Sequence, residues 1–266
     1  MKIPLSYNIR NLAARKTTTI MTALGIALTV AVLLAVLALV EGLTTALAST
    51  GNPNHVLVMR NGATSELVSV MTREWFQLLR ERPGVARNAA GQPMASLEMV
   101  TIAGLELPDS EALMNVTVRG LTPMGIEMRE HIRLAEGRWF EPGKRELVVG
   151  EAVARRYPGA RLGGQLELGR APWTVVGIMD AGRSAANSEI FCDVNQISAD
   201  QDRSGGLSSA LLRARDAVAV QALINEIEAD RRLNVMALTE KQYYDSQQAS
   251  AGSIFAMGVF VAIIMA

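Results

Sequence analysis

The sequence is short of the residues on which several kinds of functional site depend. It has one cysteine, Cys192, and two histidines, His55 and His131, among 266 residues. A single cysteine cannot form an internal disulfide or a cysteine-rich zinc site, and two isolated histidines outside any H-E-x-x-H motif make a poor metal set. The 26 lysine and arginine residues balance the 26 acidic residues, so no overall basic field would attract nucleic acid. We therefore expect no metal site and no nucleic-acid partner.

Catalytic motifs are also missing. Residues 137–145 resemble a phosphate-binding loop, G-x-x-x-x-G-K-[ST]. Counted from Gly137, however, Pro142 stands where the second glycine is required, and Arg145 follows Lys144 in place of serine or threonine. Residues 182–186 lack the closing glycine of a nucleophile elbow. The sequence therefore predicts no ATP site, no cofactor and no catalytic residue, and we expect a protein that is not itself an enzyme.

The sequence does contain a long uncharged stretch near its start. Residues 17–40 carry no charge, and a helix of 24 residues is about 36 Å long, against about 30 Å for the hydrocarbon core of a bilayer. Four positive charges precede the stretch and Glu41 is the first charge after it; they are Lys2, Arg10, Arg15 and Lys16. The positive-inside rule then predicts a cytoplasmic N-terminus and an external domain. A cleaved signal peptide ending at Ala46-Leu47-Ala48 is the alternative, but its apolar region would be about 7–15 residues long.

The two ends of the sequence indicate further contact with the membrane. In residues 1–16, Leu5, Ile9 and Leu12 follow helical spacing, which predicts an amphipathic helix on the cytoplasmic lipid surface. After Asp245 no charge appears, and residues 253–266 are almost wholly apolar but too short to cross a bilayer. We expect residues 246–266 to begin a second transmembrane helix of a longer protein. A short re-entrant or packing helix is the alternative.

Small residues recur along one side of the first span. Ala23, Ala27, Ala31 and Ala35 are spaced four residues apart, and small side chains allow two membrane helices to approach closely. These four residues are therefore candidates for a helix-packing seam. The simpler interpretation is that alanine is common in such helices. Residues 44–50 are predicted to extend the span, residues 17–50 in all, as a helical stalk.

The external region, residues 54–242, has the pattern of an α+β domain made of two βαβ-like units and a small β insert, flanked by transmembrane helices. In the first unit, residues 55–60 form a strand and residues 70–82 a helix that carries Val70 and ends before Pro83-Gly84. Residues 94–103 and 113–119 alternate as two further strands, with a turn at residues 107–109.

The second unit repeats the order of strand, helix and strand. Residues 209–213 form a strand, Asp216 caps a helix with Arg231 and Arg232 in its last turn, and residues 234–238 form the returning strand. We expect the two units to pack together, because each alone has too little apolar surface for a stable core. The predicted shared core consists of Val56, Val58, Phe76, Leu79, Leu211, Leu223, Ile224 and Ile227.

Between the units, at about 121–182, short apolar runs separated by glycine and proline predict a compact β insert. The runs are residues 146–150, 165–168 and 173–179. Glycines stand at the ends of the runs, where a positive φ or a close backbone approach would favour them: Gly137, Gly143, Gly150, Gly163 and Gly177. These residues are expected to serve folding, with contact to a partner or cargo as the alternative.

Several motifs together resemble a known family. Asn11-Leu12, the basic pair Arg15-Lys16 and the threonine-rich approach to residues 24–27 resemble the first membrane helix of MacB/FtsX-like permeases of ABC transporters. The sequences at residues 136–143, 146–154, 162–164 and 175–178, in that order and spacing, are similar to the MacB-like periplasmic core domain.

The resemblance implies a membrane subunit in a bacterial inner (plasma) membrane, with four membrane helices in the intact protein. Its implied partners are a cytoplasmic ABC ATPase subunit, a second permease copy or homologue, membrane lipid and a periplasmic adaptor. Such a subunit would couple ATP hydrolysis on the ATPase to movement of its periplasmic domain, for export, lipoprotein release or mechanotransmission. The alternative is a membrane-anchored extracytoplasmic sensor or ligand-binding module.

Overall fold

The structure is a computed structural model that describes residues 14–48, 50–107, 110–203 and 205–247. Residues Ala46–Asp245 form one compact unit, which we call the domain. The sequence predictions for residues 1–13 and 248–266 lie outside the described residues.

The first described element is the long helix α2, Lys16–Ala48. Among the described residues, it is the one helix long and apolar enough to cross a membrane, over Lys16–Leu39. Its large apolar side chains are exposed all around the helix, as in Ile20, Leu24, Leu28 and Leu34. The hydroxyls of Thr22 and Thr29 donate to carbonyls one turn earlier, at 2.9 and 3.0 Å, so these polar groups are satisfied within the helix. The helix continues to Ala48, through most of the predicted stalk.

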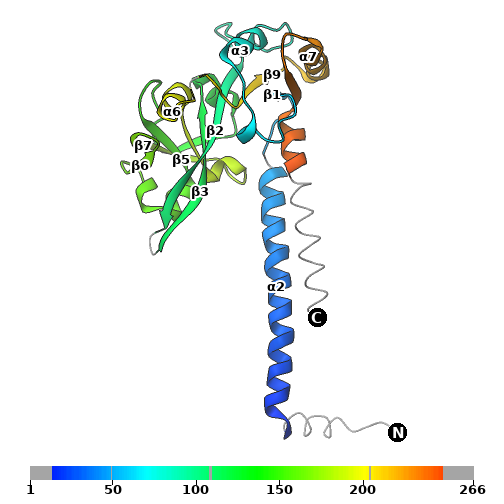
Figure 1. The fold of residues 1–266 in the computed structure, drawn as a ribbon, viewed down its shortest axis with the longest axis vertical. Coiled ribbons are helices and arrows are strands. Elements are labelled where there is room, and N and C mark those ends of the chain that lie inside the picture. The colour runs from blue at the N-terminus through cyan, green and yellow to red at the C-terminus, as the bar shows by residue number, and fades with distance from the viewer. Residues whose placement is uncertain (1–13, 49, 108–109, 204, 248–266) are drawn as a thin grey trace, which may run out of the picture. The chain divides into compact units, whose positions relative to one another are not determined.

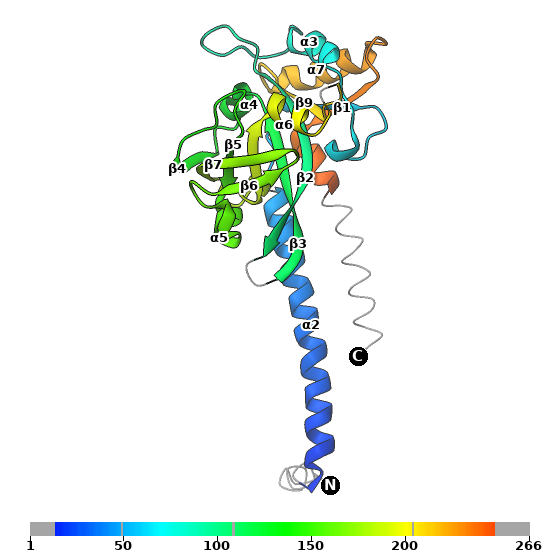
Figure 2. The same ribbon diagram turned by 60° about the vertical axis from the view of Figure 1, so that its left-hand side comes forward.

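The domain is built on a ten-stranded sheet with the order β10-β1-β9-β2-β3-β8-β5-β7-β4, and β6 pairs with β7 (Figures 1 and 2). We divide it into two halves. The first half contains β1, β9, β10 and the start of β2, with the helices α3 and α7. The second half contains the end of β2 and the strands β3 to β8. The strand β2 joins the halves because its first residues pair with β9 and its later residues pair with β3.

The first half consists of two interleaved units. Its elements are β1 His55–Arg60, α3 Arg73–Arg80, β2 Ala95–Leu107, β9 Ser209–Arg213, α7 Ala217–Ala229 and β10 Val235–Thr239. Since β1 is antiparallel to both β9 and β10, these two are parallel to each other with β1 between them, and by the same argument β1 and β2 are parallel with β9 between them. Each unit is thus a split βαβ motif. The prediction that the two units pack together is confirmed by these pairings.

The apolar core of this half lies between the sheet and the two helices, which lie side by side in both views (Figures 1 and 2). Seven of the eight predicted core residues belong to it: Val56, Val58, Phe76, Leu79, Leu223, Ile224 and Ile227. The prediction for Leu211 is wrong. In the register of β1 and β9, Leu211 is opposite Leu57, and both side chains pack on the other face of the sheet. Successive side chains of a strand point to opposite faces, so Leu212 is the residue that shares the core with Val56.

Two predicted helix boundaries also differ from the structure. The helix α3 begins at Arg73, because the hydroxyl of Thr72 caps it by accepting from the N–H of Trp75 at 3.3 Å. Val70 therefore lies outside the helix and is 40% exposed. The helix α7 is capped by Asp216 as predicted but ends at Ala229, so Arg231 and Arg232 lie beyond its last turn. The side chain of Arg232 binds Asp230 at 2.6 Å.

The second half is a mixed sheet with short helices at its connections. Its elements are β3 Ser110–Leu121, α4 Pro123–Met128, β4 Arg133–Gly137, β5 Glu146–Gly150, α5 Glu151–Arg156, β6 Gln165–Leu168, β7 Ala171–Asp180, β8 Glu189–Asp193 and α6 Val194–Asp200. Short 3-10 helices occupy Pro158–Ala160 and Ala185–Ser188 of this half, and another occupies Glu66–Val68 of the first half. The strand β8 follows the predicted limit of the insert, about 182, yet it pairs with β3 and β5, so this half extends further along the chain than predicted.

The glycines predicted at the ends of β runs in the second half have either a positive φ or a close backbone neighbour, as the sequence predicts. Gly137, Gly143 and Gly163 have φ angles of 74°, 79° and 79°. A Cβ on Gly150 or Gly177 would lie 2.2 Å from a backbone carbonyl oxygen, of Asn187 and Arg138 respectively. The first three positions require glycine because their backbone is left-handed. Gly150 and Gly177 require it because another part of the backbone approaches closely.

Candidate functional site: the junction of the two chain ends and a charged seam

The chain enters and leaves the domain at the same edge of the sheet. The domain begins with residues 50–54, which we call the incoming segment, and these lead into β1. It ends with the helical residues 240–245, which we call the outgoing segment, and these follow β10. Because β1 and β10 are antiparallel neighbours, with Val56 opposite Thr239, the start of one strand lies beside the end of the other.

The outgoing segment is joined to the sheet without a loop. The hydroxyl of Thr239, the last residue of β10, accepts from the N–H of Gln242 at 3.0 Å, and the Gln242 side chain accepts from the N–H of Thr239 at 2.9 Å. This reciprocal pair is a capping box, which satisfies two backbone donors at a helix start. A helix therefore begins at the residue after the strand. The sequence Thr-Glu-Lys-Gln at residues 239–242 carries the local signal for this helix start.

A carboxylate clasps the incoming and outgoing segments together. Glu240 Oε2 accepts from the N–H of Asn52 at 2.9 Å and lies 3.0 Å from Nδ1 of His55. Glu240 and His55 are 8% and 2% exposed. Gly51 of the incoming segment has a φ of 95° and lies against the outgoing segment, because a Cβ there would be 3.0 Å from Cα of Lys241. The two ends of the domain are therefore in direct backbone contact.

The surroundings of Glu240 favour the ionised form of its carboxyl group. Burial acts to raise the pKa of Glu240, but the hydrogen bond with His55 and the charge of Arg129 lower that pKa to about 2. The ionised carboxylate can only accept, so the proton of this contact belongs to His55 Nδ1. The other ring nitrogen of His55 is buried and has no hydrogen-bond partner among the described residues.

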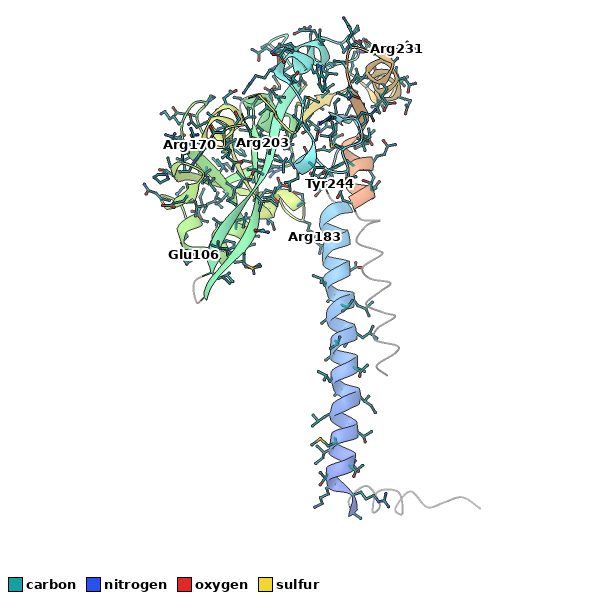
Figure 3. All side chains as sticks on the ribbon, viewed as in Figure 1. Glu106, Arg170, Arg183, Arg203, Arg231 and Tyr244 are labelled. Atoms are coloured by element: carbon teal, nitrogen blue, oxygen red, sulfur yellow. The ribbon has the colours of Figure 1, made fainter. Side chains whose placement is uncertain are left out.

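The outgoing segment also contacts the first half of the domain through Tyr243. Its hydroxyl accepts from the N–H of Glu66 at 3.2 Å, and burial raises the pKa of Tyr243 to about 12, so the phenol stays neutral. The rings of Tyr243 and Tyr244 meet edge to face with centroids 5.3 Å apart, and Figure 3 labels Tyr244 on this segment. Both tyrosines thus lie next to a buried cluster of charges.

We call that cluster the charged seam; it consists of Glu66, Glu98, Arg119, Arg129 and Glu189, none more than 9% exposed. Arg119 donates to Glu66 at 3.0 and 3.1 Å, to Glu98 at 2.9 Å and to Glu189 at 3.0 Å. Arg129 donates to both oxygens of Glu98 at 2.7 and 2.9 Å. Ser209 of β9 donates to Glu66 at 2.6 Å.

The seam joins the two halves of the sheet. Glu66 precedes α3 in the first half, Arg119 and Glu189 lie on β3 and β8 of the second, and Glu98 is on β2 where that strand changes partners. Burial opposes all of these charges, yet Arg129 and Arg119 still hold the pKa of Glu98 below its ordinary value. Each buried charge is therefore paired, as buried charges must be. The arrangement can fix an orientation between the halves but has no exposed nucleophile or proton acceptor.

The incoming segment contacts the second half. The hydroxyl of Thr50 accepts from the N–H of Ala185 at 2.8 Å, and Thr50 is 7% exposed. Ala185 is the first residue of the 3-10 helix Ala185–Ser188, which leads directly into β8. This contact and the Glu240 clasp were missed by sequence reasoning, because their partners are 135 and 188 residues apart.

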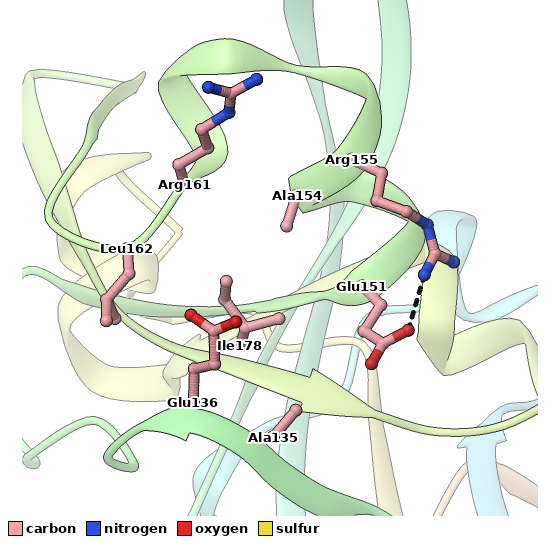
Figure 4. Close-up of a pocket in the computed structure, with 8 residues that line it drawn as sticks. All are labelled: Ala135, Glu136, Glu151, Ala154, Arg155, Arg161, Leu162 and Ile178. Atoms are coloured by element: carbon pink, nitrogen blue, oxygen red, sulfur yellow. Dashed lines mark hydrogen bonds and ion pairs between the residues drawn. The ribbon is translucent and has the colours of Figure 1, made fainter.

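A second surface is an open groove of about 580 Å³ in the second half (Figure 4). Its apolar floor includes Ala154, Leu162 and Ile178, and its rim carries two acidic and two basic residues. Glu151 and Arg155 pair across one helical turn at 2.7 Å, whereas Arg161 and Glu136 point in different directions in Figure 4.

The residues singled out from the sequence are not brought together. Ala23, Ala27, Ala31 and Ala35 lie on α2 with exposed side chains, so their role in helix packing stays a prediction. Cys192 is buried in β8, where burial raises its pKa far above that of a reactive thiol. Within the described part of the chain, no group of three or more His, Cys, Asp or Glu residues could hold a metal ion.

An apolar helix followed by this domain defines a class of membrane protein with an extracytoplasmic domain. Residues 19–230 match the family described as the MacB-like periplasmic core domain, so the chain belongs to this family, and its domain is that of an ABC-type transporter permease.

Two solved structures share the fold. The periplasmic region of MacB from Actinobacillus actinomycetemcomitans is similar with a TM-score of 0.54 and 10% identity, covering 75% of this chain and 94% of that one. The extracellular domain of the noncanonic ABC-type transporter YknZ from Gram-positive bacteria is similar with a TM-score of 0.52 and 16% identity, covering 70% of this chain and 100% of that one. No curated protein sequence matches the chain.

Proposed function

We propose that the chain is a non-catalytic permease subunit that couples ATP hydrolysis on a separate cytoplasmic ATPase to movement of its external domain, for export, lipoprotein release or mechanotransmission. The observation that carries the proposal is the junction. A helix of 33 residues leads into the domain, and a capped helix leaves it from the neighbouring strand without a loop. Two neighbouring strands that each lie next to a helix along the chain are suited to force transmission.

The direct test is ATP hydrolysis by the purified full-length permease. We expect no hydrolysis by the permease alone and hydrolysis when it is reconstituted with its ATPase subunit, because no ATP site is encoded in these residues. The matched control is the same preparation with an ATPase variant that lacks its catalytic carboxylate. Hydrolysis by the permease free of other subunits would overturn the assignment.

The orientation of the chain is a second part of the proposal. The four basic residues before residue 17 favour a cytoplasmic N-terminus and an external domain in the inner or plasma membrane. A reporter enzyme that is active only outside the cytoplasm, inserted after Gly205, should be active. A reporter that is active only inside the cytoplasm, inserted at the same position, should be inactive, and the reverse pattern would contradict the topology.

The third part of the proposal is that the chain forms a dimer with a second copy or a homologue. The alanine stripe on α2 supplies a surface on which another membrane helix can approach closely. Single cysteines at Ala27 or Ala31 in the full-length protein should cross-link in membranes if two copies meet there. A cysteine at Leu28, which is 67% exposed, is the control expected to cross-link less. Equal cross-linking at all three positions would assign the stripe no role.

The groove of Figure 4 is the surface we propose for a periplasmic adaptor. It combines an apolar floor with charges of both signs, which suits a protein partner better than a single small ion. Arg161→Glu should weaken adaptor binding to the full-length permease by reversing one rim charge. Arg133→Glu, at another exposed arginine of this half, is the control, and equal effects of the two changes would place the adaptor elsewhere.

A further inference from the structure

Two residues of the incoming segment are bonded to different parts of the domain. Thr50 is bonded to Ala185 of the second half, and Asn52 is bonded to Glu240 at the start of the outgoing segment. Only Gly51 separates them, and its backbone lies against that of Lys241. A displacement of the incoming segment relative to the outgoing one must therefore strain one of these two bonds.

The contact at Ala185 leads into a closely packed part of the second half. The 3-10 helix Ala185–Ser188 approaches β5 so closely that a Cβ on Gly150 would be 2.2 Å from the carbonyl oxygen of Asn187. The next residue along the chain, Glu189, begins β8 and binds Arg119 of the charged seam at 3.0 Å. A displacement of this 3-10 helix would therefore also displace β5, β8 and the charged seam.

We propose that Thr50 is a positioning residue that transmits displacement of the incoming segment to the second half of the domain. In this arrangement the Glu240 clasp holds the outgoing segment on the first half, and the hydroxyl of Thr50 moves the 3-10 helix at Ala185. Relative motion of the two chain ends then becomes a change in orientation between the two halves. This inference rests on the proposed function, since it specifies how motion reaches the external domain.

The test measures the distance between the halves in the full-length permease bound to its ATPase subunit in lipid nanodiscs. Spin labels are placed at Val218 of the first half, which is 87% exposed, and at Arg170 of the second half, which is 62% exposed and labelled in Figure 3. The single native cysteine is buried, so the two introduced positions take the label. Distances are recorded without nucleotide and with a non-hydrolysable ATP analogue.

Thr50→Val removes the hydroxyl and keeps the size of the side chain, so the nucleotide-dependent shift in distance should be lost. Thr50→Ser restores the acceptor and should restore the shift. Thr72→Val is the matched control, because the Thr72 hydroxyl also accepts a backbone N–H at a helix start but only within its own element. This variant should keep the full shift.

A second variant removes the same hydrogen bond from the donor side. Ala185→Pro eliminates the N–H, and proline is tolerated at the first residue of a helix. It should abolish the shift in a protein that still binds the ATPase, even where Thr50→Val fails to fold. A wild-type shift that persists in Thr50→Val or Ala185→Pro overturns the role of Thr50 and leaves the proposed function intact. Absence of any shift in the wild type, despite ATPase binding, overturns the proposed coupling and this inference with it.

Discussion

The apolar core and the charged seam are both buried, but they stabilise the domain in different ways. In the first half, aliphatic side chains of the sheet meet one face of α3 and α7, and the same apolar cluster continues into the second half with Val149, Trp173 and Ile190. The seam lies where the halves meet, and its residues come from four separate elements and from Arg129, which directly follows α4. Apolar packing is non-directional and stabilises both halves together, whereas paired charges with fixed donors and acceptors stabilise the orientation in which their hydrogen bonds form. The two kinds of burial therefore differ in how strongly they depend on the orientation between the halves.

The largest expected effect is in the core. Leu223→Asp removes a side chain that is 1% exposed and buries a carboxylate among aliphatic residues. We expect a loss of about 4 kcal/mol in the free energy of unfolding, from lost packing and an unpaired charge. Thermal unfolding of the full-length protein measures it. Val218→Asp, on the same helix but 87% exposed, should change the stability by less than about 0.5 kcal/mol. Similar losses in both variants would show that this helix face does not pack on the sheet.

The next effect is in the seam. Arg119→Met leaves Glu66, Glu98 and Glu189 without their shared cation, and breaking a buried pair in this way costs about 3 kcal/mol here, because Glu98 keeps Arg129. Hydrogen exchange should show faster exchange at β3 and β8 first, with the core under α7 still protected. Arg155→Met, which breaks an exposed ion pair with Glu151, is the control and should cost about 1 kcal/mol or less. Uniform loss of protection after Arg119→Met would mean that the seam and the core unfold together.

Substitution of two glycines in the second half distinguishes the cost of a positive φ from the cost of a steric clash. Gly137 and Gly143 both have positive φ angles, but a Cβ on Gly137 would meet the Val176 carbonyl oxygen at 2.2 Å, and one on Gly143 would meet nothing within 4 Å. Gly143→Ala should therefore cost about 1 kcal/mol from backbone strain alone. Gly137→Ala should cost about 2–3 kcal/mol, because overpacking is added. Urea unfolding of the two variants compares them directly. Equal losses would show that φ alone decides both positions.

The sequence predicts the core better than the seam for a physical reason. Asp216 and the spacing of Leu223, Ile224 and Ile227 are local signals, and the helix forms where they place it. The misplacement of Leu211 came from strand register, since a run in which every residue is apolar does not show which side chains face the helices. The seam has no local signal. Arg119 binds Glu66 and Glu189 from 53 and 70 residues away, and each of these charges resembles an ordinary surface residue until the strands are paired.

The smallest effect concerns the Glu240 clasp, and it tests whether the junction is a third, acid-sensitive region. Burial alone would raise the pKa of Glu240, but His55 and Arg129 lower it from 4.5 to about 2. A depressed pKa means that the folded state favours the charged form, so this contribution to stability is present above pH 4.5 and is lost as the pH falls toward 2.

Glu240→Gln cannot ionise and should be less stable than the wild type by about 1–2 kcal/mol at pH 7, with the difference shrinking between pH 4.5 and 2. Urea unfolding across this range measures the difference. Glu106→Gln, at an exposed position of β2, should follow the wild type at every pH. A difference between Glu240→Gln and wild type that stays constant down to pH 2 would show that the charge of Glu240 does not contribute to the clasp.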